Sequence, residues 1–341
     1  MRLPLSVFAA VSALLAALPA AAQSPAEFYR GRNVTFLIGY PTGNGYDAYS
    51  RLLIRHLGRH VPGNPTILPE NMPGAGSMVM INHLYNVAVK DGSVIGLPSR
   101  DLIIEPLLGN SQAKFDPRKL AWIGSMNKDT AVCVAWGKTG VKTLDQVKSQ
   151  PLAVGATGTA SGSFLLPQLL NAVLDTKFKI ILGYPDASAV NIALERGELE
   201  AFCTSYAAIE TARPQWLSEH QVNVLAQLGM TRSPAIDAPM VLDMTKDDAA
   251  KQAMTLVFAS QEMGRPVAGP PGMPGDRLQA MRTAFDATMK DPAFLEEARR
   301  QRFAIDAITG AQVDALLDRM YATPKPIVDK VVALRPKEAA K

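Results

Sequence analysis

The segment that decides the fold is Gly39-Tyr40-Pro41-Thr42-Gly43-Asn44-Gly45-Tyr46-Asp47. It joins an apolar strand predicted at 34–38 to an amphipathic helix that we expect to begin near Asp47. Glycine lets such a loop approach a ligand closely, and the N–H groups and dipole at a helix N-terminus favour an anion. We therefore predict an anion site with Asp47 as the helix N-cap, although an ordinary capped turn has the same pattern.

The first 22 residues have the pattern of a secretory signal peptide. Arg2 precedes the apolar run 3–18, and small residues lead to a predicted cleavage after Ala22. The run is shorter than the roughly 20 apolar residues of a membrane span. No cysteine stands directly after the cleavage point to carry a lipid. We therefore expect a soluble mature protein in the periplasm.

The composition favours two α/β domains. A chain of 341 residues with 48% hydrophobic content can bury a large core and exceeds the usual size of one domain. The net charge of +4 becomes +3 when Arg2 is removed with the signal peptide, and no arginine-rich run with interleaved aromatic residues predicts a nucleic-acid partner. Strand and helix signals alternate, and from Met254 on we expect mostly helices.

The only cysteines, Cys133 and Cys203, leave two alternatives open. An oxidising compartment would allow them to pair, but each stands in an apolar, strand-like context that equally suits a buried free thiol. The sequence does not give the Cα separation on which pairing depends. His56 and His60 stand four residues apart without the accompanying Glu of a zinc protease, so we expect no metal and no cofactor.

Two later features could complete an anion site. The loop 155–163 offers hydroxyl groups and leads into a helix, which suits a carboxylate or phosphate oxygen; a solvated polar connection is the alternative. Arg100 lies just past a strand predicted at 93–97, where α/β sheets place their ligands, and could pair with an anion through both guanidinium nitrogens. A surface arginine beside its loop is the other interpretation.

Two enzymatic interpretations of these loops are weak. The segment 43–48 satisfies a relaxed Gly-x-Gly-x-x-Ala dinucleotide motif, but Asp47 would stand where a pyrophosphate approaches, and an exported protein meets little dinucleotide. Ser161 and Ser163 lie in no Gly-x-Ser-x-Gly elbow, and no candidate loop contains a histidine. We therefore expect a protein that is not an enzyme.

Several motifs follow one another in a specific order: Tyr40-Pro41-x-Gly-x-Gly-Tyr-Asp47, Glu70-Asn71-Met72-Pro73-Gly74-Ala75-Gly76, Lys90-Asp91-Gly92, the loop 155–163, Gly183-Tyr184-Pro185 and Leu194-Glu195-Arg196-Gly197-Glu198-Leu199-Glu200. In this order the sequence resembles the Bug family of periplasmic solute receptors, the binding proteins of tripartite tricarboxylate transport systems. The resemblance covers nearly the whole mature chain.

The resemblance implies a two-domain Venus-flytrap fold with the ligand in the cleft. One domain would comprise residues 24–131 and 241–341, and the other residues 132–240. The family holds a carboxylate mainly through loop amides, hydroxyls and waters, and we add Arg100 and Tyr206 from their positions. The implied ligand-binding residues are Pro41, Thr42, Asn44, Gly45, Tyr46 and Asp47 on one side, with Arg100, and Thr157, Thr159, Ser161, Ser163, Tyr184, Asp186 and Tyr206 on the other.

The sequence also departs from the family. Asn44 interrupts the usual triple-glycine loop, and the segment 164–167 lacks a histidine that many members carry. We therefore expect a small organic carboxylate, with an aromatic acid as one candidate because Tyr46, Tyr184 and Tyr206 surround the predicted cleft. The expected protein is a monomeric receptor that serves inner-membrane permease subunits; a receptor for signalling and, less favoured, an exported enzyme using the same cleft are the alternatives.

Overall fold

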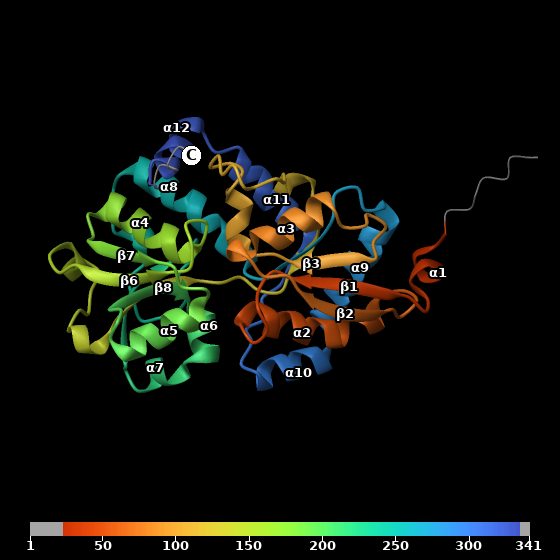
Figure 1. The fold of residues 1–341 in the computed structure, drawn as a ribbon, viewed down its shortest axis with the longest axis horizontal. Helices are drawn as coiled ribbons and strands as arrows, with labels where there is room; N and C mark the ends of the chain where they lie inside the picture. Colours follow the sequence, from red (N-terminus) through yellow and green to blue (C-terminus); the bar gives the residue numbers. More distant parts are fainter. Residues whose placement is uncertain (1–22, 335–341) are drawn as a thin grey trace, which may run out of the picture.

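The computed structural model describes residues 23–334, so the predicted signal peptide at 1–22 lies outside the described residues. Two β-sheets, each flanked by helices, form the two halves of the molecule (Figure 1). We call the six-stranded sheet with its helices the first half and the five-stranded sheet with its helices the second half. The predicted α/β architecture is confirmed.

The sheet of the first half has the strand order β11-β4-β10-β3-β1-β2. Strand β1 is parallel to β2 and β3, whereas β10 is antiparallel to β3 and β4. Strand β1 carries a nearly continuous apolar run because helices cover both faces of the parallel part of the sheet. The strands are β1 (Asn33–Ile38), β2 (Thr66–Asn71), β3 (Val94–Leu97), β4 (Ala121–Ser125), β10 (Pro266–Gly269) and β11 (Ile308–Thr309).

The sheet of the second half has the strand order β7-β6-β8-β5-β9. Strand β6 is parallel to β7 and β8, and β5 is antiparallel to β8 and β9. The strands are β5 (Ala131–Trp136), β6 (Leu152–Ala156), β7 (Phe178–Leu182), β8 (Ala201–Ser205) and β9 (Val222–Leu228). Both sheets therefore combine parallel strands with an antiparallel edge, and in both the parallel strands end toward the other half (Figure 1).

Helices cover both faces of each sheet. In Figure 1, α3 and α11 lie on one face of the first sheet and α2 and α10 on the other, while α4 and α5 lie on opposite faces of the second sheet. The helices are α1 (Pro25–Tyr29), α2 (Gly45–Leu57), α3 (Met78–Asn86), α4 (Gly162–Leu174), α5 (Ala187–Arg196), α6 (Tyr206–Ala212), α7 (Pro214–Ser218), α8 (Asp248–Phe258), α9 (Gly275–Thr288), α10 (Pro292–Arg300), α11 (Gly310–Tyr321) and α12 (Lys325–Val332).

The C-terminal part of the chain touches both halves. Strands β10 and β11 belong to the first sheet, but α8 and α12 lie beside α4 over the second sheet (Figure 1). The side-chain amide of Gln168 on α4 donates to the carbonyl of Leu334, 3.2 Å away. The expected assignment of 241–341 to the first domain remains a prediction, and this range contains helices that pack on the second half.

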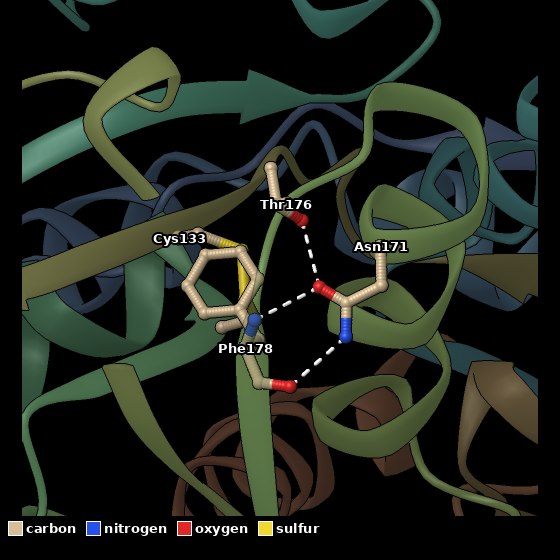
Figure 2. Close-up of a disulfide and its surroundings, with 5 residues drawn as sticks. Cys133, Asn171, Thr176 and Phe178 are labelled. Carbon is tan, nitrogen blue, oxygen red and sulfur yellow. Dashed lines mark hydrogen bonds between the residues drawn. A yellow bond between two sulfur atoms is a disulfide. The ribbon is translucent and has the colours of Figure 1, made fainter. Parts of the chain in front are cut away.

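Cys133 and Cys203 form a disulfide, which decides between the two alternatives that the sequence leaves open. The two residues are direct partners in the antiparallel pair β5–β8, with Cα atoms 4.0 Å apart. Figure 2 shows that the bond lies beside Phe178 at the start of β7, whose backbone is held by the side chain of Asn171 on α4. The disulfide thus joins two central strands inside the second half.

The two histidines considered as metal ligands have a structural role instead. His56 Nε2 lies 2.5 Å from Glu297 Oε2, and His60 Nε2 lies 2.8 Å from Asp291 Oδ2, so they tie α2 and the 3₁₀ turn that follows it to α10 and its N-cap. Within residues 23–334, no three His, Cys, Asp or Glu side chains gather as a metal site. No helix in that range is long and apolar enough to cross a bilayer.

Candidate functional site

A cavity of about 220 Å³ lies between the two halves. Its walls are the segments that follow β1, β2 and β3 of the first sheet and β6, β7 and β8 of the second. The carboxyl ends of parallel strands are where α/β folds place their ligands, because helix N-termini and variable loops meet there. We call this cavity the cleft.

Asn44, and not Asp47, is the N-cap of the helix that follows the first loop, so that prediction is wrong. Helix α2 begins at Gly45, and the Asn44 Oδ1 atom accepts a hydrogen bond of 3.0 Å from the Asp47 amide. Asn caps a helix as well as Asp does, so the helix can start two residues earlier than expected. The first amides of α2, those of Gly45 and Tyr46, consequently open toward the cleft.

Asp47 orders the first loop from behind. Its carboxylate accepts hydrogen bonds of 2.9 Å from the Gly43 amide and from Arg51 Nε, and a third from the side chain of Asn71. Burial on its own would raise the pKa of Asp47, but the hydrogen bonds from Arg51 and Gly43 outweigh it and hold that pKa below its usual value. Asp47 therefore stays ionised and shapes the loop without lining the cleft.

Two buried arginines give the cleft its positive charge. Arg265 precedes β10, is 2% exposed, and lies with its guanidinium between the rings of Tyr46 and Tyr49, 4.5 and 4.9 Å from their centroids. Its Nη2 atom is 3.8 Å from the point where a Cβ would sit on Gly45, at the start of α2. Arg100, at the start of the 3₁₀ turn Arg100–Ile104, is 6% exposed and lines the same cavity.

Asp129 balances only part of this charge. It lies in the segment between β4 and β5 that joins the halves, and its carboxylate accepts a hydrogen bond from Arg100 and stands 3.6 Å from Arg265 Nη1. Burial would raise the pKa of Asp129, but the two guanidinium groups outweigh it and hold that pKa below its usual value. The Nε atoms of both arginines have no hydrogen-bond partner within residues 23–334. Asp101 Oδ1 lies 3.6 Å from Arg100 Nε, so Arg100 has a second carboxylate beside it, whereas Arg265 shares Asp129 with Arg100. The unpartnered Nε of Arg265 makes that guanidinium the group best suited to an anionic ligand.

The second half contributes hydroxyl groups. Ser163 Oγ accepts a hydrogen bond of 3.1 Å from the Thr157 amide and lies 2.8 Å from Ser161 Oγ. Ser161 is the N-cap residue of α4, but its hydroxyl donates to the Gly158 carbonyl at 2.7 Å and does not cap the helix. The predicted small-polar loop therefore presents a chain of mutually bonded hydroxyls at the mouth of α4.

The structure brings together nine of the predicted site residues and leaves five outside the cleft. Thr159 is exposed, and Tyr206 points its hydroxyl toward the Ala235 carbonyl, 3.4 Å away. The residues that line the cleft are Pro41, Asn44, Gly45, Tyr46, Arg100, Thr157, Ser161, Ser163 and Asp186; those that do not are Thr42, Asp47, Thr159, Tyr184 and Tyr206. Only Tyr46 remains of the three tyrosines expected around the ligand, so the argument for an aromatic acid is weaker.

Sequence reasoning missed several residues that line the cleft. The turn 73–77 forms one part of the wall, and the polar residues among those missed are Tyr40, Ser77, Asp101, Thr204, Ser205, Gln261 and Arg265. The turn was visible as the Asn-x-Pro-Gly-Ala-Gly motif, whose glycines permit the positive φ values found at 74 and 76. Arg265 stands directly before a short apolar strand, which is the one signal that could have placed it at a strand end.

A second hollow differs from the cleft in its chemistry. It has a volume of about 620 Å³ and lies between α8 and α11, with Met230, Leu256, Leu316 and Met320 among its lining residues. The segment after the edge strand β9 contributes Met230 and Thr231, and the other walls are α8, the residues just after it, α11 and the segment 322–324, so the parallel strands of neither sheet end there. The cleft, with its converging helix N-termini and buried arginines, is the candidate site.

Solved structures with this architecture match the present chain over nearly its whole length. A TctC solute-binding protein from Polaromonas is 21% identical with a TM-score of 0.65, and 89% of this chain matches 99% of that one. The periplasmic binding protein BugD is 17% identical with a TM-score of 0.71, over 90% of this chain and 99% of its own. The chain has the TctC/Bug fold.

MatC from Rhodopseudomonas palustris, solved with bound malate, has the same TctC/Bug fold. It is 18% identical with a TM-score of 0.68, over 89% of this chain and 99% of its own. No protein-family model matches the chain, and no curated protein matches it in sequence. The TctC/Bug fold of this chain is thus established by its architecture, in agreement with the resemblance noted in its motifs.

Proposed function

We propose that the chain is a periplasmic receptor that captures a small organic carboxylate in the cleft. The observation that carries the proposal is the pair of buried arginines, Arg100 and Arg265, beside the N-terminus of α2. A carboxylate there would accept from the guanidinium nitrogens that have no hydrogen-bond partner and meet the open amides of the helix. The malate bound to MatC, a protein of the same fold, supports a carboxylate as the ligand class.

The receptor would deliver its ligand to inner-membrane permease subunits of the tripartite tricarboxylate type, as a member of the Bug family. Its two domains would be residues 24–131 with 241–341 and residues 132–240, closing on the ligand as a monomer after removal of residues 1–22. We infer that the protein is not an enzyme, because among the described residues the cleft lining holds no histidine to act as a base for Ser161 or Ser163, and its cysteine, Cys203, is in the disulfide.

A thermal-shift screen against small carboxylates, followed by calorimetry, tests the proposal. A ligand at 100 times its dissociation constant should stabilise the protein by about 2.7 kcal/mol. The amide of each carboxylate that binds is the matched control and should give no shift, because it lacks the charge that the arginines balance. A screen in which acids and amides act alike, or in which no carboxylate shifts the unfolding temperature, would contradict the function.

The variant Arg265→Gln tests whether the carboxylate binds beside Arg265. Asp129 keeps Arg100 as its partner in this variant, so the fold should survive. We expect carboxylate affinity to fall about tenfold to a hundredfold, the range for a lost hydrogen bond to a charged group. Arg118→Gln is the matched control, because Arg118 pairs with Asp116 on the surface and lines no part of the cleft.

A further inference from the structure

The guanidinium of Arg265 is held mainly by aromatic rings. Its Nη1 atom donates a hydrogen bond of 2.8 Å to the Gly264 carbonyl and lies 3.6 Å from Asp129, too far for a second one. Its Nε atom has no hydrogen-bond partner in the described part of the chain. The ring centroids of Tyr46 and Tyr49 lie 4.5 and 4.9 Å from the guanidinium carbon. Because the face of an aromatic ring attracts a cation, these two rings are the main restraint on the guanidinium.

The two tyrosines differ in their place relative to the cleft. They stand three residues apart on α2, so their side chains lie on the same face of the helix. Tyr46 lines the cleft and stacks on Tyr40, with ring centroids 4.4 Å apart. Tyr49 is 2% exposed and does not line the cleft. A ligand in the cleft can therefore contact Tyr46, whereas Tyr49 acts on the site through Arg265.

Tyr49 is itself held by the segment that follows α10. Its ring stacks on Phe303 with centroids 4.3 Å apart and an interplanar angle of 18°, and its hydroxyl donates a hydrogen bond of 3.3 Å to the Ala304 carbonyl. A chain of contacts thus runs from this segment through Tyr49 to Arg265. It continues toward the start of α2, because Arg265 Nη2 lies 3.8 Å from the point where a Cβ would sit on Gly45.

We propose that Tyr49 is a positioning residue for ligand binding: its ring holds the Arg265 guanidinium toward the N-terminus of α2 and so raises the affinity for a carboxylate that Tyr49 does not touch. This inference rests on the proposed function. A guanidinium fixed before binding loses little side-chain freedom when the carboxylate arrives, and this lowers the entropic cost of association. If Tyr49 were only a core residue, replacing it would change stability and leave binding unaltered.

The test is a double-mutant cycle in the mature protein. Calorimetry compares malate, succinate and adipate, and the acid of these three that binds most tightly is the probe. Tyr49→Leu removes the ring and should weaken binding of the probe about threefold to thirtyfold, the range for one lost cation–aromatic contact. In an Arg265→Gln background, the same substitution should change the affinity by less than about twofold, because the contact is already absent. Tyr49→Phe keeps the ring and should bind the probe as the wild-type protein does.

Tyr29→Leu is the matched control. Tyr29 is also buried in the first half, its hydroxyl donates a hydrogen bond of 3.1 Å to the Gly92 carbonyl, and its ring packs on Phe28. It lines no part of the cleft. Tyr29→Leu should lower the unfolding temperature as Tyr49→Leu does, since both remove a buried ring, but it should leave the affinity unchanged.

Three results would overturn the inference and leave the receptor function standing. They are a wild-type affinity in Tyr49→Leu, a loss of the same size in the Arg265→Gln background, and an equal loss in Tyr29→Leu. If Tyr49→Leu does not fold, Tyr49→Met, which fills more of the space without an aromatic ring, takes its place in the cycle. If none of the three acids binds the wild-type protein, the inference falls together with the receptor function.

Discussion

The two sides of the cleft hold their loops by different chemistry. On the first side, the carboxylate of Asp47 gathers the Gly43 amide, Arg51 and Asn71 into one charged network. On the second side, the hydroxyls of Ser161 and Ser163 bond to each other and to the Gly158 carbonyl, and the charge that reaches this loop comes from Asp101 of the first half, which accepts from the Gly162 amide. The first loop is therefore ordered before a ligand binds, whereas the hydroxyls of the second loop can exchange hydrogen-bond partners when a ligand binds.

The largest loss of stability is expected for a substitution at Asp129, which lies where the two sides join. Asp129→Asn removes the charge between Arg100 and Arg265; it leaves the buried Arg265 without its counterion, while Arg100 keeps only the contact of 3.6 Å with Asp101. Breaking a buried ion pair in this way costs about 3–5 kcal/mol of the free energy of unfolding, measured by urea denaturation. Asp329→Asn, which breaks an exposed pair with Lys325, is the control and should leave the urea midpoint unchanged.

The difference in stability between the wild-type protein and Asp129→Asn should depend on pH, with a defined sign. The pKa of Asp129 in the folded protein lies below that of the unfolded chain, about 3.9. Its contribution is therefore complete above that unfolded value and is lost as pH falls through the lower folded value. Wild-type protein should lose stability more steeply than Asp129→Asn below about pH 4. Parallel acid profiles would mean that Asp129 is not ionised between the arginines.

A matched pair of substitutions separates the two sides directly. Asp47→Ala removes three hydrogen bonds to a charged group and should cost about 3 kcal/mol of stability, together with most of the binding. Asp186→Ala, at the start of α5 on the second side, removes one cap and should cost about 1 kcal/mol. Equal losses in urea denaturation would contradict the claim that the first loop depends more on its carboxylate than the second side does on Asp186.

The smallest change in stability is expected for substitutions in the loop of the second side that contains Ser161 and Ser163. Ser161→Ala combined with Ser163→Ala should leave the unfolding temperature almost unchanged, because the lost bonds are local and neutral. Carboxylate binding should weaken by about 0.5–1.5 kcal/mol for each hydroxyl that contacts the ligand. Thr159→Ala is the control, since Thr159 is exposed and lines no part of the cleft. Unchanged affinity in the double variant would remove this loop from the site.

Local patterns predicted much of the fold. The parallel strands and their helices follow from apolar runs and turn residues that each lie within a few positions of one another, as in 33–57 and 152–174. Strands β10 and β11 were missed within a region expected to be helical. They have four and two residues, and they are strands only because β3 and β4, more than 100 residues away, supply their hydrogen-bond partners.

The parts of the site that are built from residues close together in the sequence were predictable. The loops around Gly45 and Ser161 were found because glycines, hydroxyls and a following helix stand together in the sequence. Arg265 and Asp101 were not predicted from the sequence, because their roles depend on tertiary contacts. The position of β10 brings Arg265 to Tyr46, and Asp101 contacts Gly162 across the cleft. The cysteine pairing likewise required the register of β5 on β8.

The central claim is that the first side of the cleft binds the carboxylate of the ligand. The most direct measurement is a crystal structure of the protein with the acid that binds most tightly in calorimetry. We predict a carboxylate oxygen within about 3.2 Å of a guanidinium nitrogen of Arg265 or Arg100, or of the Gly45 or Tyr46 amide. A carboxylate bound in the hollow between α8 and α11, or held only by the hydroxyls of Ser161 and Ser163 with the first side of the cleft empty, would contradict the account.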